Sequence, residues 1–143
     1  MHRLTRRKDE RDMTRILVVD DEDTICKLYA EELRDEGYDV ITTNVGKGLV
    51  EMIKEYGPEL VVLDIRMGAY DGLDLLQDIR MAHYNLPVIL CSAYASFKYD
   101  LKSAAADYYV VKSTDLSELK DKIHMALEAV ASATIWRIRA NGN

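Results

Sequence analysis

The sequence predicts an α/β protein in which five βα units build one doubly wound parallel sheet. Short apolar runs rich in β-branched residues alternate along the chain with amphipathic stretches of helical spacing. Most of these runs are nearly continuous rather than alternating, which is typical of parallel strands covered on both faces. The 143 residues suffice for one ordinary domain and are too few for two of typical size.

The first two units are each closed by a glycine. Residues 16–19 are the first predicted strand, and the helix after it ends at Gly37. That helix is predicted from four apolar side chains on one helical face: Ile25, Leu28, Tyr29 and Leu33. The second strand is expected at residues 40–42, followed by a helix through residues 49–53 that ends at Gly57 and Pro58.

The remaining three units repeat the same pattern. Their strands are expected at residues 60–63, 88–91 and 108–111. Apolar residues at helical spacing mark the helices that follow: Leu73, Leu76 and Ile79 in the third unit, Phe97, Leu101 and Ala105 in the fourth, and Leu116, Leu119, Ile123, Leu127 and Val130 in the fifth. Asp115 and Glu118 form a cap-like pair at the start of the fifth helix.

The connections between strands determine the topology. Each crossover is long enough to return the chain parallel to the preceding strand, and right-handed crossovers place helices on both faces of the sheet. Five strands fit the order 2-1-3-4-5 of a flavodoxin-like three-layer sandwich better than the six-stranded dinucleotide-binding order. Ligands of such sheets bind outside the carboxyl ends of the strands where the order reverses, here between the first and third strands.

Charge divides the chain into an acidic domain with cationic ends. We expect a basic N-terminal extension at residues 1–14, one domain at residues 15–131, and either a tail or an extension of the fifth helix at residues 132–143. Residues 1–15 carry a net charge of +3 and residues 132–143 a net charge of +2, so the −6 of the whole chain leaves −11 for residues 16–131. So acidic a domain is not expected to bind nucleic acid directly.

Composition excludes several other classes. Hydrophobic residues make up 48% and charged residues 31% of the chain, as in soluble globular proteins. No apolar run approaches the length of a bilayer span, and no apolar stretch near the N-terminus resembles a secretory signal. We therefore expect a cytoplasmic protein without membrane contact. Cys26 and Cys91 lie in no CxxC or Cys/His cluster, which argues against redox or zinc chemistry.

Side chains that can bind a cation or a phosphoryl group follow four of the five predicted strands. Asp20 and Asp21 follow the first, Asp64 the third, Ser92 the fourth and Lys112 the fifth. We expect them to meet, because the carboxyl ends of parallel strands share one edge of the sheet. Carboxylates held this close repel one another unless a cation neutralises them, and an oxygen-only set of ligands suits a hard ion. Mg²⁺ is the expected ion, with Mn²⁺ as an alternative.

A carboxylate beside a divalent ion and a lysine has the surroundings needed to attack a phosphoryl donor. The metal and Lys112 would offset charge on the phosphoryl oxygens, and the Ser92 hydroxyl could donate a hydrogen bond to them. The product would be an aspartyl phosphate on Asp64. Taken singly, each residue has an ordinary explanation as a helix cap or a solvated side chain. Their coincidence at one edge favours a site.

Four segments of the sequence resemble the receiver domain of bacterial two-component response regulators, a CheY-like domain. They are residues 16–22, residues 63–67 together with Asp71-Gly72, residues 91–93 and residues 106–112. The resemblance runs from about residue 15 to about residue 130. It implies that Asp64 accepts a phosphoryl group from a sensor histidine kinase or a histidine phosphotransfer protein.

The resemblance also assigns roles around Asp64. It implies that Asp20, Asp21, Asp64 and the backbone carbonyl of Arg66 hold the metal, and that Lys112 contacts the phosphoryl group.

The resemblance also implies a conformational switch. Ser92 and Tyr109 would form the switch pair, in which the hydroxyl moves to the phosphoryl group and the aromatic ring turns inward. The face made by the fourth helix, fifth strand and fifth helix would then change for a downstream protein target or a phosphorylation-dependent homodimer. Tyr108 points to the opposite sheet face and is expected in the core.

Two loops depart from the family pattern. Residues 67–69 read Met-Gly-Ala where the family usually has Met-Pro-Gly, which leaves that loop less constrained. Ser113 follows Lys112 where the family usually has a proline in a cis peptide. A non-proline cis bond costs about 3 kcal/mol, so this peptide is either trans with a shifted loop or a strained cis bond.

Two variable positions flank the path by which water would reach the phosphoryl group. Arg66 lies two residues beyond Asp64, and Tyr94 lies two residues beyond Ser92. One hypothesis is that both side chains shield the acyl phosphate and slow its hydrolysis; the alternative is that both face solvent.

The leading interpretation is a phosphorylation-dependent signalling switch without an output domain, and not an enzyme beyond phosphorylation and dephosphorylation of its own Asp64. A receiver fragment of a larger transcriptional regulator is the alternative, although no helix-turn-helix follows residue 131. An aspartyl-nucleophile phosphohydrolase is a third class. Such enzymes need a second aspartate two residues after the nucleophile, where this chain has Arg66.

Overall fold

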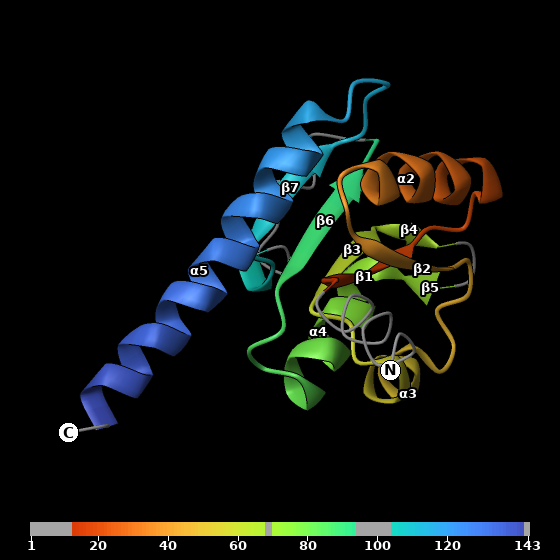
Figure 1. Cartoon of the computed structure of the whole chain (residues 1–143). Coiled ribbons are helices and arrows are strands. Elements are labelled where there is room, and N and C mark those ends of the chain that lie inside the picture. The colour runs from red at the N-terminus through yellow and green to blue at the C-terminus, as the bar shows by residue number, and fades with distance from the viewer. Residues whose placement is uncertain (1–12, 68–69, 94–103, 142–143) are drawn as a thin grey trace, which may run out of the picture.

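Five parallel strands form the central sheet of the protein. In the computed structural model, which describes residues 13–67, 70–93 and 104–141, the strands are β1 (Arg15–Val19), β2 (Asp39–Thr43), β3 (Leu60–Asp64), β6 (Val88–Ser92) and β7 (Tyr108–Val111). Their order is β2-β1-β3-β6-β7 (Figure 1). Since β6 and β7 are the fourth and fifth strands of this sheet along the chain, the predicted order 2-1-3-4-5 is confirmed.

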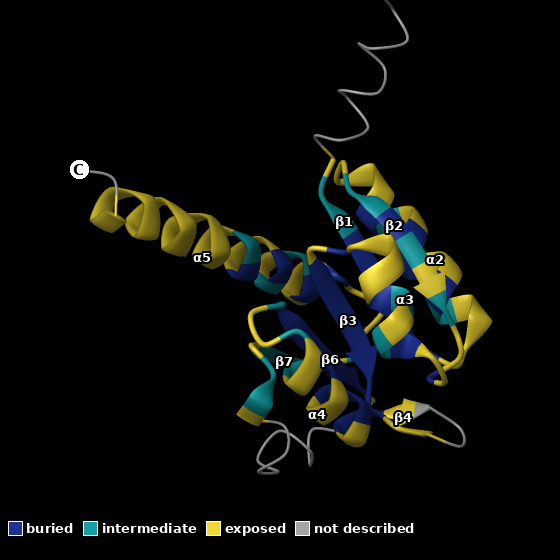
Figure 2. Ribbon diagram, turned by 90° about the horizontal axis from the view of Figure 1, so that it is seen from below, coloured by how far each residue is buried: buried dark blue, intermediate teal, exposed yellow. Residues whose placement is uncertain are grey.

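Burial explains why the strand sequences are continuous apolar runs. Every residue of β3 and of β6 is buried, because both strands are interior to the sheet and helices cover both of its faces (Figure 2). The register aligns the strand ends: Val19 pairs with Leu63, Asp64 with Cys91, and Ser92 with Val111. The residues that follow these strands are therefore delivered to one edge.

Two helices of the described part of the chain cover each face of the sheet. On one face α2 (Asp23–Asp35) and the first part of α5 (Ser117–Asn141) pack on a core that includes Leu33 and Ile123. On the other face α3 (Leu49–Tyr56) and α4 (Gly72–Ala82) pack on a core that includes Ile53 and Leu76. The predicted first, second, third and fifth helices are thus confirmed. The predicted fourth helix, with Phe97 and Leu101, falls largely on residues 94–103, which lie outside the described part of the chain.

A short hairpin that the sequence pattern does not predict follows β3. Its strands are β4 (Arg66–Met67) and β5 (Tyr70–Asp71), with Arg66 paired to Asp71. The hairpin returns the chain to Gly72, whose N–H donates to the carbonyl of Ile65 at 2.7 Å. A Cβ at Gly72 would collide with the carbonyl oxygen of Asp64. Glycine at this position therefore lets the start of α4 lie directly against the end of β3.

Helix α5 extends well beyond the sheet. Its buried residues are Leu119, Ile123 and Ala126, and residues 128–141 are exposed. Figures 1 and 2 show this second half projecting from the body of the protein. The helix includes residues 132–141. The sequence allowed either a tail or an extension of the fifth helix in this region.

No helix in the described part of the chain is both long enough and apolar enough to cross a membrane.

Candidate functional site

Three aspartates meet at the carboxyl edge of the sheet. Asp20 and Asp21 follow β1, and Asp64 is the last residue of β3. One carboxylate oxygen from each residue lies within 4.8 Å of the others, with Asp20 and Asp64 buried and Asp21 exposed. Backbone hydrogen bonds fix the Asp20 position: its N–H donates to the carbonyl of Thr43 at 3.1 Å, and its Oδ1 accepts from the N–H of Glu22 at 3.0 Å.

Lys112 supplies the positive charge of this cluster. Its Nζ lies 2.7 Å from Asp20 Oδ2 and 3.3 Å from Asp64 Oδ2, and its side chain is only 14% exposed. The N–H of Lys112 donates to the carbonyl of Ser92 at 2.7 Å, which continues the pairing of β6 with β7 past the end of β7. A single cation thus bridges two buried carboxylates delivered by neighbouring strands.

The electrostatics of the cluster raise the pKa of Asp64 above the usual value of an aspartate. Burial, followed by the negative charge of Asp20, raises the pKa of Asp64 to about 6, although Lys112 and the N–H of Arg66 act in the opposite direction. Burial by itself would lower the pKa of Lys112, but hydrogen bonds and charge from Asp20 and Asp64 outweigh it, and the pKa is raised. Lys112 therefore stays protonated at neutral pH. Among the described residues of this cluster, Lys112 is the one cation facing three aspartates, so their negative charge is in excess.

The donor set fits a hard cation. Carboxylate oxygens are the ligands that Mg²⁺ prefers, and Mg²⁺ usually binds through one or two carboxylates and retains several waters. The group found among the described residues contains three aspartates and neither histidine nor cysteine, which argues against a zinc or copper site. Arg66 begins β4 directly beside this cluster, and its N–H donates to Asp64 Oδ1 at 3.3 Å.

Ser92 and Tyr109 lie next to each other on neighbouring strands. Ser92 ends β6 and is 1% exposed. Tyr109, in β7, is partly buried against the core under α3 and α4. A side-chain hydrogen bond joins the two residues; burial raises the pKa of Tyr109, and this hydrogen bond partly opposes the rise. Tyr108 packs against the other core, as the alternation of side chains along a strand predicts.

Not every sequence-predicted residue is brought to the cluster by the described structure. Tyr94 lies outside the described residues, as do Gly68 and Ala69 of the altered loop. The side chain of Arg66 is exposed. No peptide bond within the described ranges is cis, so Lys112 and Ser113 are joined in trans.

Two residues that support the cluster from beneath, Cys26 and Tyr29, are not predicted in this role by the sequence pattern. The Cys26 Sγ lies 3.3 Å from the carbonyl oxygen of Asp20, to which it donates. The Tyr29 hydroxyl lies 3.5 Å from the Cys91 Sγ, within the core below Asp20 and Asp64. Helical spacing placed Tyr29 on the buried face of its helix, but spacing alone gives no sign of a polar partner on the sheet.

Comparison with known proteins agrees with this geometry. The family model of the response regulator receiver domain matches residues 16–124. Regulatory protein AtoC of Escherichia coli (strain K12) is 32% identical over 118 residues, which cover 81% of this chain and 26% of AtoC. The chain thus spans about a quarter of the length of the first curated relatives it matches.

Solved structures give the same result. Response regulator protein TrrA from Thermotoga maritima, in complex with Mg²⁺-BeF, is 42% identical with a TM-score of 0.77, over 80% of this chain and 99% of TrrA. TrrA in complex with the histidine kinase ThkA matches with 42% identity and a TM-score of 0.76, over the same 80% and 99% of the two chains.

Proposed function

This chain belongs to the response regulator receiver domain family, and from that premise we propose that it is a phosphorylation switch whose phosphoacceptor is Asp64. One observation carries the proposal. The buried carboxylate of Asp64 lies 3.3 Å from Lys112 Nζ and shares an acidic cluster with Asp20 and Asp21 at the edge of the sheet. Receiver domains are signalling modules, so we propose no turnover of external substrates.

The proposed metal ligands are Asp20, Asp21, Asp64 and the backbone carbonyl of Arg66. Support comes from the oxygen-only donor set and from the Mg²⁺-BeF complex of TrrA, with which the chain shares 42% identity. When bound, Mg²⁺, or Mn²⁺ in its place, supplies positive charge that offsets the charge of the phosphoryl oxygens.

In the proposed reaction a carboxylate oxygen of Asp64 attacks the phosphorus of a phosphohistidine donor. The new O–P bond forms as the P–N bond breaks, and the electron pair of that bond leaves with the imidazole. In this proposal Lys112, which is paired with Asp20 and Asp64, exchanges its contact with Asp64 for one with a phosphoryl oxygen. The pKa of about 6 at Asp64 leaves the nucleophile mostly ionised at neutral pH.

The proposed switch depends on the hydroxyl of Ser92. A serine hydroxyl has one proton to donate, and this hydroxyl already shares a hydrogen bond with Tyr109. Donation to a phosphoryl oxygen on Asp64 would change that bond and the position of the Tyr109 ring. Because Tyr109 lies in β7, the change would be transmitted to the face formed by β7, α5 and the segment before β7.

The proposed partners follow from the family. Since TrrA is found in complex with a histidine kinase, we propose that a sensor kinase or a histidine phosphotransfer protein phosphorylates this chain in the cytoplasm. The altered face would then bind a downstream protein or a second copy of the chain. We place the receiver at residues 15–131, between a basic extension and the end of α5.

A receiver within a longer transcriptional regulator is the second candidate. The chain covers only 26% of AtoC and 48% of CtrA, the cell cycle transcriptional regulator of Caulobacter vibrioides. In that case the same switch would act on an output domain of its own chain.

Acetyl phosphate tests the proposal without a cognate kinase. Incubated with Mg²⁺, the wild-type protein should gain the mass of one phosphoryl group, and Asp64→Asn should gain none. Asp39→Asn, which removes a partly exposed carboxylate paired with Arg15, is the matched control and should be modified like the wild type. Equal modification of wild type and Asp64→Asn, or modification that does not require Mg²⁺, would contradict the proposal.

A further inference from the structure

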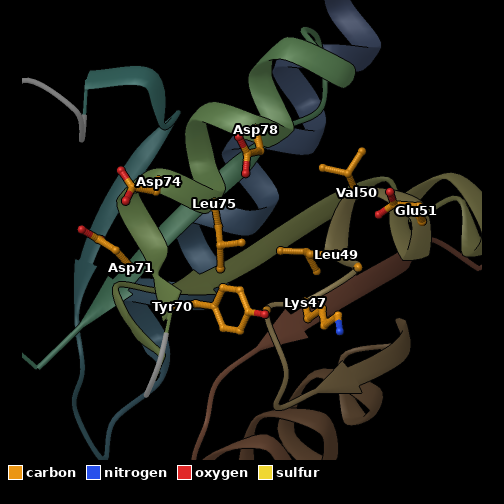
Figure 3. A pocket seen from close by; sticks show the side chains of 11 residues that line it. Lys47, Leu49, Val50, Glu51, Tyr70, Asp71, Asp74, Leu75 and Asp78 are labelled. Carbon is orange, nitrogen blue, oxygen red and sulfur yellow. The ribbon is translucent and has the colours of Figure 1, made fainter.

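A groove separates α3 from α4 on the face of the sheet away from α5. It has a volume of about 430 Å³, and its lining comes from residues 46–48 before α3, the start of α3, the hairpin strand β5 and the first two turns of α4. Figure 3 shows Leu49, Leu75 and Tyr70 between the two sides of the groove. Leu49 and Leu75 are buried, and Tyr70 is 37% exposed, with its side chain packed against Gly46. The floor of the groove is therefore apolar.

The walls of the groove are acidic. Asp74 and Asp78 lie on α4, Asp71 directly precedes that helix, and Glu51 lies on α3 (Figure 3). Lys47 is the one cation among the described lining residues. Asp71 caps α4, because its Oδ1 accepts from the N–H of Leu73 at 2.9 Å. Glu51 and Asp78 are exposed to solvent at the mouth of the groove. An apolar floor between carboxylate walls fits a cationic peptide segment that carries an apolar side chain.

The N-terminal segment of this chain has that chemistry. Residues 2–8 read His-Arg-Leu-Thr-Arg-Arg-Lys and contain four cations, no acid and one leucine. We propose that residues 2–8, which lie outside the described part of the structure, bind in the groove between α3 and α4 of the same chain. Leu4 would contact the apolar floor, and the arginines would face Glu51 and Asp78.

The path from the described chain to the groove is short. Arg15 Nη1 donates to the carbonyl oxygen of Tyr56 at 2.8 Å, and the N–H of Glu59 donates to the carbonyl oxygen of Arg15 at 2.8 Å, so the start of β1 lies within the length of an arginine side chain of the last residue of α3. Glu51 is five residues earlier in α3, about 7 Å along the helix axis. Residues 9–13 can span up to about 17 Å when extended, which is more than twice this distance and leaves room for the length of the Arg15 side chain. Residues 2–8 can therefore reach the groove without any rearrangement of the domain.

Because residues 2–8 are tethered to the domain, weak contacts with the groove are sufficient for binding. Exposed ion pairs are individually weak and are screened by salt. A short flexible tether, however, holds a segment at an effective concentration in the millimolar range, about 1 mM or more. Binding should therefore be substantial at low ionic strength, lost at high ionic strength and independent of protein concentration.

Limited proteolysis of the full chain tests this inference. Trypsin cleaves after the same arginines and lysine that the groove would hold, and intact mass reports each cut. At low salt, cleavage between residues 3 and 8 should be roughly tenfold slower in the wild type than in Glu51→Lys/Asp78→Lys, and about 0.5 M NaCl should abolish the difference. The control Glu31→Lys/Asp121→Lys makes the same charge change at exposed residues of α2 and α5 and should stay protected.

Methyl NMR spectra of the full chain provide a readout that does not depend on trypsin. Arg6→Glu/Arg7→Glu should shift the methyl signals of Leu49, Val50 and Leu75, and combining it with Glu51→Lys/Asp78→Lys should restore them. Equal cleavage of the wild type and Glu51→Lys/Asp78→Lys at low salt, with unmoved methyl signals, would overturn the inference. Protection that rises with protein concentration would also overturn it, because it would assign the groove to a second copy. Neither readout depends on phosphorylation of Asp64.

Discussion

Replacing Asp64 with asparagine should stabilise the metal-free protein at neutral pH. The Asp64 side chain is 7% exposed, and burial and the charge of Asp20 raise its pKa to about 6. Asparagine has nearly the same shape, but its single oxygen can replace only one of the two acceptors, Oδ1 for the N–H of Arg66 or Oδ2 for Lys112. The substitution therefore removes an unfavourable charge and gives up one hydrogen bond, which offsets the gain by about 1 kcal/mol.

The pKa shift sets the size of the effect. From 3.8 in the unfolded chain to about 6 in the folded protein is roughly 2 units, and each unit corresponds to about 1.4 kcal/mol. The ionised carboxylate should thus lower the free energy of unfolding by about 2–3 kcal/mol. Because the folded state holds the proton more tightly, this loss is absent below about pH 4, grows as the pH rises from 4 to 6, and is complete above that range.

Urea unfolding followed by circular dichroism, with EDTA present, measures the difference between the two proteins. Asp64→Asn should be more stable than the wild type by about 1–2 kcal/mol at pH 7.5, and the gap should close as the pH falls toward 4.5. Asp121→Asn removes an exposed carboxylate of α5 and should change stability by less than about 0.5 kcal/mol. A less stable Asp64→Asn protein, or a gap that does not change with pH, would refute the reasoning.

Three further predictions concern the same edge of the sheet. Millimolar Mg²⁺ should raise the thermal midpoint of the wild type, and Asp20→Asn should abolish most of that rise; an equal rise in both proteins in a thermal melt would exclude Asp20 as a ligand. Gly72→Ala should lower the free energy of unfolding by about 2–3 kcal/mol, because the new Cβ meets the Asp64 carbonyl oxygen; unchanged stability in urea would show that this contact relaxes freely. Arg66→Ala with Tyr94→Ala should speed loss of the phosphoryl group, measured by intact mass after the donor is removed, whereas an unchanged rate would mean that neither side chain shields it.

The sequence predicts the sheet well because burial on both faces leaves a distinct pattern. The runs that became β3 and β6 contain only apolar residues up to their last position, and long crossovers between such runs favour a parallel sheet covered on both faces. The meeting of Asp20, Asp64 and Lys112 follows from topology alone, since each comes at or directly after the end of a parallel strand.

The sequence pattern does not predict features that depend on local geometry rather than on the periodicity of apolar residues. The strands β4 and β5 have two residues each, which is too short for any alternation to be detected. The close approach at Gly72 is a tertiary contact that looks like an ordinary turn glycine in the sequence. The bridging of Asp20 and Asp64 by one lysine depends on side-chain conformations that strand order does not specify.

The position of the phosphoryl group tests the central claim most directly. After reaction with acetyl phosphate and Mg²⁺, reduction with borohydride converts an aspartyl phosphate to homoserine, which peptide mass spectrometry can assign to one residue. We predict homoserine at residue 64 and at no other aspartate. Homoserine at a different aspartate, or none in a protein that has gained phosphoryl mass, would contradict the assignment of Asp64 as the phosphoacceptor.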